Sequence, residues 1–288
     1  MLDAHTIAVV IPALNEARLL PRTLANLPRL VDVVVVVDDG STDRTAEVAR
    51  TCRAPCPVVV VSHAHNQGVG AAIVTGYRWC LERGMDIAVV MGADNQMHPD
   101  DLPNLLEPLM HDAADYVTGD RLAWPGGWRR FPPVRLLGVW ALAYLTRWAT
   151  GLPDLRDAQC GYTAITHTGL AHIPLHRLYA RYGFPNDMLA KVTLAGLRVA
   201  HQPVRPVYDT EISALRIHAV IAPLLRLTFA NRLERFRLER ATLPQVTPKR
   251  FHGSTTSSTP ASLHPHRPST PQEARTQGPP RHPMSTHP

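Results

Sequence analysis

Cysteines and long hydrophobic runs are scarce in this chain, and both shortages exclude classes of protein. Four cysteines in 288 residues are too few and too irregularly spaced for a disulfide-stabilised secreted scaffold. Cys52 and Cys56 lie one helical turn apart, but no second ligand pair follows, so we expect buried thiols in a reducing compartment and no zinc site. The longest apolar run, residues 136–145, is shorter than the roughly 18–20 residues that a membrane-spanning helix needs.

Net positive charge is also lacking over most of the chain. The formal net charge is +6, but residues 216–243 and 244–288 each carry +4, which leaves −2 for residues 1–215. A basic surface for a polyanion is therefore not expected on the body of the protein. Residues 244–288 have almost no aromatic side chains on which nucleic-acid bases could stack, so we expect no nucleic-acid partner.

Short apolar runs alternate with helical stretches over the first 120 residues. The expected strands are residues 7–11, 31–37, 58–61, 87–91 and 116–118. The expected helices are residues 16–27, 43–53, 68–83 and 100–112. Strands that are apolar almost throughout are typical of a parallel sheet covered on both faces, and the alternation predicts a doubly wound α/β fold. In such folds ligands bind beyond the carboxyl ends of the strands.

The alternation of short apolar runs and helical stretches ends after residue 123. Residues 134–150 predict an apolar helix with two tryptophans, and residues 217–240 predict an amphipathic helix interrupted by Pro223. From Pro244 onward, proline, serine and threonine make up about half of the residues, too polar a composition to offset the entropy of ordering. We therefore expect residues 244–288 to be a disordered tail.

Polar side chains follow four successive expected strands, each at the point where the strand ends. The four segments are residues 12–16, 38–43, 65–71 and 92–99. Asp38 and Asp39 are adjacent at a strand end and point in different directions, so one can accept a hydrogen bond from a base and the other from ribose hydroxyls. A plain helix cap would account for Ser41 or Asp43, but it would leave two charges at the edge of the core unexplained.

Residues 65–71 suggest a wall of the nucleotide-binding site, and residues 92–99 suggest a metal site. Gly68 and Gly70 allow either close approach of a ligand or close packing of a helix on the sheet. Asp94 and Gln96 place a carboxylate and an amide oxygen on one side of an extended segment. Mg²⁺ or Mn²⁺ suits such oxygen ligands and completes its shell with phosphate and water. Because parallel strands end at one edge, the four segments should meet there.

The chain resembles glycosyltransferase family 2, particularly the branch of polyprenyl (dolichyl) phosphate sugar synthases. The matching segments, in family order, are VVIPALNE (9–16), VVVDDGSTDRT (35–45), HNQGVGAAI (65–73), VVMGADNQMHPDDL (89–102), VTGDR (117–121), DAQCGYTAI (157–165), YGFPNDML (182–189) and RPVYDTEIS (205–213), followed by Arg216. The resemblance implies a GT-A fold, a nucleotide diphosphate sugar as donor, a divalent metal, and inversion at the anomeric carbon.

The resemblance also assigns roles to individual residues. Those implied in binding the nucleotide sugar are Pro12, Ala13, Asn15, Glu16, Asp38, Asp39, Asn66, Gly68, Gly70 and Asp94. Asp94 and Gln96 would hold Mg²⁺ or Mn²⁺, although the family often has a first carboxylate where this chain has Gly92. Asp94 and Asp187 stand at the catalytic positions, and Asp187 would take the proton of an acceptor hydroxyl.

The remaining assignments concern the acceptor. Asp157 and Gln159 would line the sugar and acceptor site, and Arg121, Arg205 and Arg216 are candidates for holding an acceptor phosphate. Each arginine fits a surface or ion-paired role equally well. If the acceptor is a phosphate, its oxygen is already anionic, and Asp187 would serve mainly to orient it.

The predicted organisation has four parts. These are a nucleotide-sugar-binding half (1–123), an acceptor-binding half of the same domain (124–216), an amphipathic helical segment (217–243) and the tail (244–288). The helices at 134–150 and 217–240 combine apolar side chains with arginines, a pattern typical of helices that lie in a membrane interface. The alternative is a helix packed on its own domain or on a second subunit.

The predicted function is an inverting transfer of sugar from a UDP- or GDP-sugar to a polyprenyl phosphate by a cytoplasmic protein bound to the membrane face. One alternative keeps the donor but uses a hydroxyl of a polysaccharide, a glycolipid or a soluble acceptor. A second alternative is a non-catalytic protein that binds nucleotide sugars.

Overall fold

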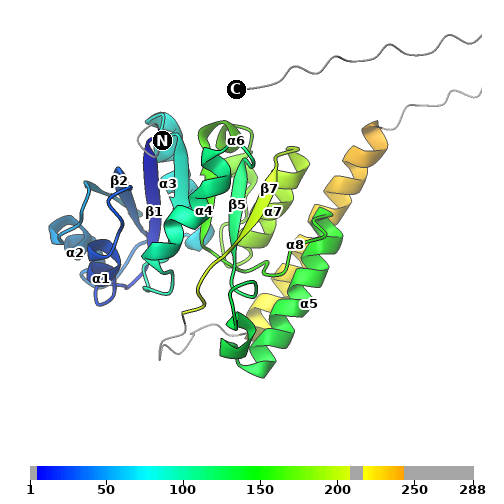
Figure 1. The fold of residues 1–288 in the computed structure, drawn as a ribbon, viewed down its shortest axis with the longest axis horizontal. Coiled ribbons are helices and arrows are strands. Elements are labelled where there is room, and N and C mark those ends of the chain that lie inside the picture. The colour runs from blue at the N-terminus through cyan, green and yellow to red at the C-terminus, as the bar shows by residue number, and fades with distance from the viewer. Residues whose placement is uncertain (1–4, 208–216, 243–288) are drawn as a thin grey trace, which may run out of the picture. The chain divides into compact units, whose positions relative to one another are not determined.

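The computed structural model describes residues 5–207 and 217–242. Arg216 and the predicted tail at 244–288 lie outside this part of the chain. The described chain forms a seven-stranded sheet in the order β3-β2-β1-β4-β6-β5-β7 (Figure 1). The strands are β1 (Ile7–Ala13), β2 (Val33–Asp38), β3 (Val58–Ser62), β4 (Ile87–Val90), β5 (Tyr116–Asp120), β6 (Thr163–Thr166) and β7 (Val199–Pro203). Only β6 is antiparallel to its neighbours, so the α/β, mostly parallel fold is confirmed.

Helices cover both faces of the sheet. They are α1 (Leu20–Ala25), α2 (Thr45–Thr51), α3 (Val69–Glu82), α4 (Leu102–Met110), α5 (Pro133–Thr150), α6 (His167–Ala171), α7 (Phe184–Leu194) and α8 (Ile217–Thr242), with 3-10 turns η2 (Pro99–Asp101), η3 (Gly127–Arg130) and η4 (Leu175–Arg177). Alternate residues of β1 enter two separate cores: Val9 packs with α1 and α4, and Val10 packs with α3 and α7. The sheet is therefore covered by apolar side chains on both faces, which explains why the strands are apolar almost throughout.

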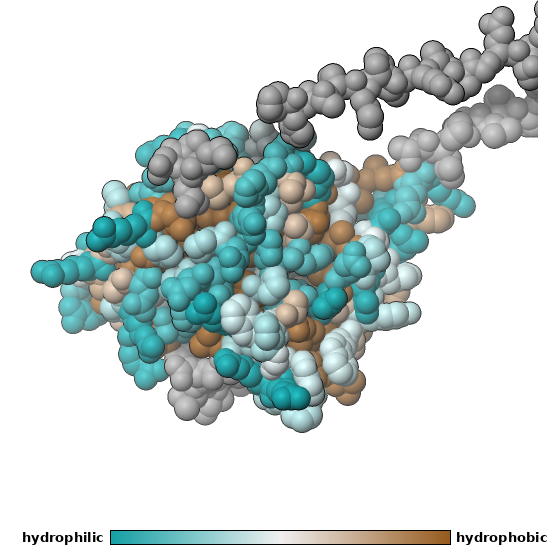
Figure 2. All heavy atoms as spheres, in the orientation of Figure 1, coloured by the Kyte–Doolittle hydropathy of each residue, from teal (hydrophilic) through white to brown (hydrophobic). Residues whose placement is uncertain are grey.

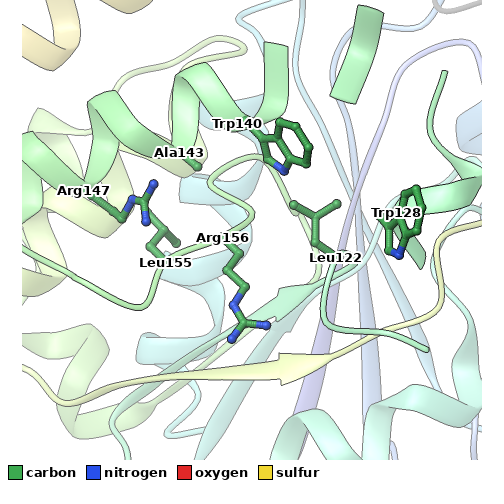
Figure 3. Close-up of a pocket in the computed structure, with 7 residues that line it drawn as sticks. All are labelled: Leu122, Trp128, Trp140, Ala143, Arg147, Leu155 and Arg156. Atoms are coloured by element: carbon green, nitrogen blue, oxygen red, sulfur yellow. The ribbon is translucent and has the colours of Figure 1, made fainter. Parts of the chain in front are cut away.

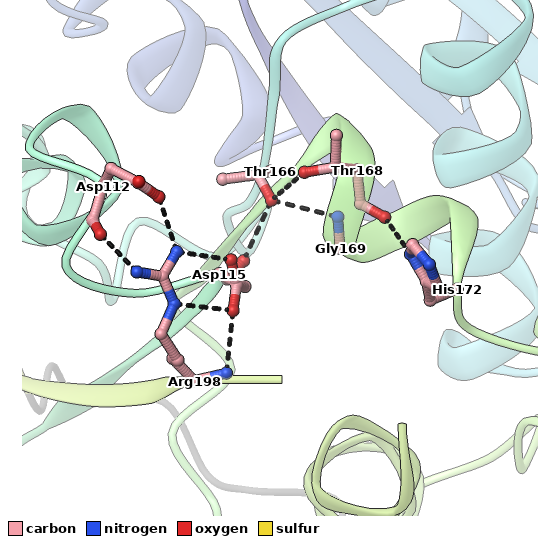
Figure 4. A network of polar contacts seen from close by, with 7 residues as sticks. All are labelled: Asp112, Asp115, Thr166, Thr168, Gly169, His172 and Arg198. Carbon is pink, nitrogen blue, oxygen red and sulfur yellow. Dashed lines mark hydrogen bonds and ion pairs between the residues drawn. The ribbon is translucent and has the colours of Figure 1, made fainter. Parts of the chain in front are cut away.

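A polar cluster ties three strands together at one edge of the sheet (Figure 4). The Arg198 guanidinium, just before β7, donates from Nη2 to Asp115 Oδ1 at 2.8 Å and from Nε to Asp115 Oδ2 at 3.1 Å. Asp115 lies just before β5, and its backbone carbonyl accepts the N–H of Thr166 at the end of β6. The cluster therefore fixes the sheet edge opposite to the one where β4 and β5 end.

Two long helices, α5 and α8, lie side by side (Figure 1). Their contact includes an edge-on pair of rings, Trp148 and Phe229, with centroids 5.4 Å apart. The predicted interruption at Pro223 is wrong, because α8 continues through this residue. On the face drawn in Figure 2, hydrophobic residues reach the surface on the side where α5 and α8 lie. None of the helices in the described ranges is long and apolar enough to cross a bilayer.

Candidate active site

The turns after β1 and β2 are tied into one unit. The Asn15 N–H donates to Ser41 Oγ at 2.9 Å, and Asn15 Oδ1 accepts the N–H of Thr42 at 2.8 Å. The Glu16 N–H donates to Thr45 Oγ1 at 2.8 Å. These bonds hold residues 14–19 as a loop, so α1 begins at Leu20 and not at residue 16 as predicted. Pro12 and Ala13 pair with Val37 and Asp38 in the sheet, so the nucleotide-binding candidates of both turns are brought together.

Asp39 faces the protein interior. Its Oδ1 lies 2.7 Å from His63 Nδ1 and accepts the N–H of Gln67 at 2.9 Å, and its Oδ2 accepts the N–H of Gly68 at 2.8 Å. Both Asp38 and Asp39 are buried, and Asp38 Oδ1 accepts the Ser41 N–H. Asp39 is therefore directed into the loop that precedes α3, and the contact of either carboxylate with a nucleoside stays a prediction.

Sequence reasoning missed His63, which directly follows β3 and connects two parts of this region. Its Nε2 lies 2.9 Å from Thr75 Oγ1 on α3, while its Nδ1 faces Asp39. The imidazole is almost completely buried. A histidine close to the end of an expected apolar strand, next to the polar segment 65–71, was the available signal. Asn66, in that same segment, is exposed.

The two glycines at the start of α3 allow close approach of backbone to backbone. A Cβ on Gly68 would lie 2.4 Å from the carbonyl oxygen of Ala180, and one on Gly70 would lie 2.2 Å from that of Tyr179. The Ala71 N–H donates to the Ala180 carbonyl at 3.1 Å. The two glycines thus allow close packing against the segment that leads into α7, and not against the sheet, while the approach of a ligand to them stays a prediction.

The candidate metal-binding turn follows β4. Asp94 Oδ1 accepts the N–H of Gln96 at 3.1 Å, and both residues are half-buried. Thr23 Oγ1 on α1 donates to the Ala93 carbonyl at 3.0 Å, which ties this turn to the β1–α1 region. A Cβ on Gly92 would lie 2.8 Å from Asp94 Oδ1, so a side chain there would require the Asp94 carboxylate to shift.

No group of three His, Cys, Asp or Glu residues suited to a metal ion occurs in the described part of the chain. The turn therefore offers one carboxylate and one amide oxygen from protein side chains. That donor set fits Mg²⁺ or Mn²⁺, because these ions take few ligands from a protein and complete their shell with phosphate oxygens and water. It does not by itself distinguish the two ions.

Arg121 and Asp157 form a bidentate ion pair beyond the end of β5. Arg121 Nε donates to Asp157 Oδ2 at 2.6 Å and Nη2 donates to Oδ1 at 2.9 Å. The Asp157 side chain is fully buried, and the guanidinium also stacks on the ring of Phe131. Asp157 Oδ1 accepts the N–H of Gln159, so these three predicted acceptor-site residues lie together.

Gln159 begins a chain of buried polar contacts that runs away from the sheet. Its Nε2 donates to Asn186 Oδ1 on α7, and Asn186 Nδ2 donates to Thr146 Oγ1 on α5 at 2.6 Å. The segment before β6 is therefore held in register with both helices. Sequence reasoning missed Asn186 and Thr146, whose partners are 27 and 40 residues away along the chain.

Arg205 is also engaged by carboxylates. Its backbone N–H donates to Asp101 Oδ2 at 2.7 Å, and its Nε lies 3.1 Å from Asp101 Oδ1. The guanidinium also lies over the ring of Trp124 and 3.3 Å from Asp100. Arg121 and Arg205 thus both show the ion-paired role that the sequence had left as an alternative to phosphate binding.

Asp187 is enclosed by protein groups. The residue is 1% exposed, its Oδ2 accepts the N–H of Tyr179 at 2.7 Å, and Oδ1 lies 4.0 Å from Lys191 Nζ. Lys191 in turn pairs with Glu234 on α8 at 2.5 Å. Burial raises the pKa of Asp187. The Asp187 carboxylate is thus held by the Tyr179 N–H and lies near Lys191, and its role toward an acceptor stays a prediction.

A pocket of about 570 Å³ lies between α5, the turn after β5 and the segment before β6 (Figure 3). Its lining residues are Leu122, Trp128, Trp140, Ala143, Arg147, Leu155 and Arg156. Sequence reasoning assigned no site residue to this pocket. The signals were arginines at the end of the apolar helix and directly before Asp157.

The chain is similar to known proteins in sequence and in structure. A model of the family described as Glycosyl transferase family 2 matches residues 8–173. An undecaprenyl-phosphate mannosyltransferase from Micrococcus luteus is 34% identical over 239 residues, which are 80% of this chain and 97% of that protein. A UDP-N-acetylglucosamine–dolichyl-phosphate N-acetylglucosaminyltransferase from Methanococcus voltae is 29% identical over 224 residues, covering 73% of this chain and 88% of that protein.

A solved structure shares the fold. Glucosyl-3-phosphoglycerate synthase from Mycobacterium tuberculosis, in complex with Mn²⁺, uridine diphosphate and phosphoglyceric acid, superposes with a TM-score of 0.59 at 23% identity. The match covers 81% of this chain and 79% of that chain. The fold is thus the GT-A fold expected from the sequence.

Proposed function

Because the chain belongs to glycosyltransferase family 2, we propose that it transfers a sugar from a UDP- or GDP-sugar to a polyprenyl phosphate, with inversion at the anomeric carbon. That it is a glycosyltransferase follows from the family match and the relatives. The polyprenyl phosphate acceptor is supported by the names of two relatives that differ in the sugar they transfer.

One structural observation carries the proposal: the Asp94–Gln96 turn and the Arg121–Asp157 pair lie at the same edge of the sheet. Val90 at the end of β4 and Thr118 near the end of β5 both pair with Thr163, the first residue of β6. The turn suited to a diphosphate and its metal is therefore separated from the candidate acceptor side by one strand. In this proposal residues 1–123 hold the donor and residues 124–216 hold the acceptor.

On the donor side, we assign the nucleoside to the joined turns after β1 and β2. Pro12, Ala13, Asn15 and Glu16 would form one wall with Asp38. The Asp39 carboxylate would act by holding the Gln67 and Gly68 N–H groups, which fixes the loop that carries the exposed Asn66. Such pre-formed walls lower the entropic cost of binding the donor.

Asp94 and Gln96 would hold the metal and thereby the diphosphate. Bound Mg²⁺ or Mn²⁺ supplies a positive charge that stabilises the negative charge developing on the leaving nucleoside diphosphate. The protein's own part is to keep Asp94 oriented, through its bond from the Gln96 N–H and through the tie between Ala93 and Thr23.

The inward direction of Asp187 agrees with a phosphate acceptor. A hydroxyl acceptor must lose a proton as it attacks, which requires a base in contact with it. A phosphate oxygen is already anionic at neutral pH and attacks the anomeric carbon without such a base. Attack opposite to the leaving diphosphate then gives inversion. Asp187 would contribute by holding the Tyr179 N–H, and with it the segment that packs on Gly68 and Gly70.

We further propose that the protein works at the cytoplasmic face of a membrane, bound through α5 and α8. On α8, the side chains of Ile221, Leu225, Phe229 and Leu233 recur at every fourth residue and are exposed. On an adjacent face of α8, Leu224, Thr228 and Asn231 are buried against the protein. Exposed arginines on α8 would add attraction to anionic lipid.

The function is tested by incubating the full chain with a panel of UDP- and GDP-sugars, Mg²⁺ or Mn²⁺, and undecaprenyl phosphate in detergent. Mass spectrometry should detect a sugar-linked lipid phosphate together with the released nucleotide, for one donor above the others. Omission of lipid or metal is the control. Nucleotide release that is equal without lipid phosphate, or transfer to a hydroxyl acceptor alone, would contradict the proposed acceptor.

A further inference from the structure

We propose that the pocket between α5 and the segment before β6 binds the phosphate-bearing end of a single-chain isoprenoid lipid, with Arg147 and Arg156 as its phosphate ligands. The inference rests on the proposed function and assigns its acceptor site to residues that neither the motifs nor the relatives' names identify. It starts from the finding that Arg121 and Arg205 are already paired with carboxylates.

Arg147 and Arg156 are distinguished by their lack of partners. Neither guanidinium has a hydrogen bond, an ion pair or a ring contact within residues 5–207 and 217–242. Burial raises the pKa of Asp120, and Arg156 opposes this rise only through its charge, without a hydrogen bond between them. The Asp120 carboxylate instead caps the N–H groups of Leu122 and Ala123 at 2.9 and 3.0 Å. Two unpaired arginines in one pocket are suited to a phosphate group, which a guanidinium binds through paired hydrogen bonds.

The backbone that carries Arg156 is held firmly. Its neighbours Leu155 and Asp157 are each 1% exposed, whereas Arg156 itself is exposed. Asp157 is fixed by Arg121, and Gln159 is fixed by Asn186. The guanidinium is thus presented from a rigid segment, which reduces the entropy lost when it binds an anion.

The rest of the pocket is apolar and aromatic. In Figure 3, Arg147 and Arg156 lie toward one end of the pocket, Trp128 lies at the other, and Trp140 and Leu122 lie between them. Leu155 and Ala143 close the wall and are buried. An anion site next to indole rings fits a ligand with a charged head and a hydrocarbon chain, because the chain gains by leaving water.

The pocket continues into an exposed apolar stripe on α5. Leu137, Trp140, Tyr144 and Trp148 recur at three- and four-residue spacing, which places them on one face of the helix. All four are exposed, Leu137 and Tyr144 to 67%. A chain leaving the pocket past Trp140 would therefore follow this stripe toward the surface that we assign to the membrane.

The location of the pocket suits transfer. Leu122 follows Arg121 directly, and Arg156 precedes Asp157 directly, so both walls adjoin the ion pair at the sheet edge where β4 also ends. A phosphate held here would stand on the acceptor side of that edge. The Arg121–Asp157 ion pair then holds the segments that carry Leu122 and Arg156 against each other.

Binding is tested directly with farnesyl phosphate, a soluble short-chain probe, by calorimetry and by quenching of tryptophan fluorescence in the full chain without donor. Wild type should bind farnesyl phosphate more tightly than farnesol and more tightly than inorganic phosphate. Arg147→Gln and Arg156→Gln should each weaken binding about tenfold, the loss of one charge-assisted contact. Arg83→Gln, at an exposed arginine that stacks on Trp79 at the end of α3, is the matched control.

Steady-state kinetics separates this proposal from the proposed function. The two pocket variants should raise KM for the lipid phosphate with little change in KM for the nucleotide sugar, while the Arg83 variant behaves as wild type. If transfer to polyprenyl phosphate occurs but both variants bind farnesyl phosphate like wild type, the pocket assignment is overturned and the function stands. Equal affinity for inorganic phosphate or farnesol also overturns it. Sugar transfer to a hydroxyl acceptor with no binding of farnesyl phosphate overturns the function itself.

Discussion

Asp187 Oδ2 accepts the backbone N–H of Tyr179 at 2.7 Å and so closes the turn that leads into α7. The carbonyl of the same Tyr179 lies where a side chain on Gly70 would stand. The buried Asp187 carboxylate is thus connected, through one residue, to the start of α3.

Asp187→Asn should retain most activity. An asparagine oxygen can still accept the Tyr179 N–H, and a phosphate acceptor needs no base, so we expect kcat to change by less than about fivefold. The measurement is kcat for transfer to lipid phosphate, with Asp187→Ala as the comparison, since alanine removes the acceptor of that bond. A fall of 100-fold or more in the Asn variant with an unchanged Tm would mean that Asp187 is a catalytic base after all.

The same variant should change the pH dependence of stability. Burial raises the pKa of Asp187, so the folded state binds its proton more readily than the unfolded state. The free energy of unfolding therefore falls as pH rises from about 4, the unfolded value, through the folded pKa. Asp187→Asn removes this loss, so its stability relative to wild type should increase with pH over that window. Urea unfolding at several pH values measures the free energy of unfolding of both proteins. If the two plots of this free energy against pH are parallel, the raised pKa of Asp187 is contradicted.

Gly70→Ala should destabilise the protein by about 1–3 kcal/mol, because its Cβ would lie 2.2 Å from a backbone carbonyl that cannot move without displacing α7. Gly138→Ala on α5 is the matched control. No atom lies within 4 Å of its added Cβ, so it should stabilise the helix by about 0.5–1 kcal/mol. Thermal unfolding of the two variants tests this difference. Equal Tm values would show that the segment before α7 does not pack closely on Gly70.

Asp94→Asn should reduce kcat about 100-fold or more, since it removes the charge of the only carboxylate in the candidate metal-binding turn at residues 92–99. Chelation of divalent ions by EDTA should abolish donor binding in wild type, and added Mn²⁺ or Mg²⁺ should restore it. Glu107→Gln, an exposed change on α4, serves as the control. Full turnover in EDTA would remove the metal from the proposed mechanism.

Arg198→Gln should lower stability without affecting catalysis, because Arg198 lies at the opposite sheet edge (Figure 4). The Arg198 guanidinium lowers the pKa of Asp115. That stabilisation is present above the unfolded pKa of about 3.9 and is lost as pH falls through the folded value. The difference in Tm between wild type and variant should therefore be present at pH 7 and shrink at low pH. A kcat that falls together with Tm would contradict the separation of the two edges.

Much of the sheet could be predicted from the sequence, because β1, β2 and β4 are runs of apolar residues buried on both faces. β6 and β7 gave weaker signals. Thr163–Thr166 and Val199–Pro203 are short and partly polar, and β6 lies in the sheet only through pairing with strands that are distant in sequence. Local patterns carry no information about such pairing, so the antiparallel strand was not foreseen.

The strand ends that carry the candidate residues could be predicted from the sequence, but the partners of their side chains could not. Strand ends correctly located Asp39 and Asp94, since parallel strands must finish at one edge. Which way a carboxylate points depends on partners that only the fold supplies. Asp39 meets His63, 24 residues away, and Arg121 meets Asp157, 36 residues away. Spacing alone could not distinguish an arginine that is free for a ligand from one that is already neutralised.

The antiparallel strand β6 has a consequence for how the enzyme can open. It hydrogen-bonds to β4 on one side and to β5 on the other. Strands from residues 1–123 and from residues 124–216 therefore belong to one continuous sheet. A shared sheet opposes a rigid-body swing of the two predicted halves against each other. Admission of donor and release of product must then be governed by rearrangement of the loops beyond the strand ends, as in enzymes gated by a lid.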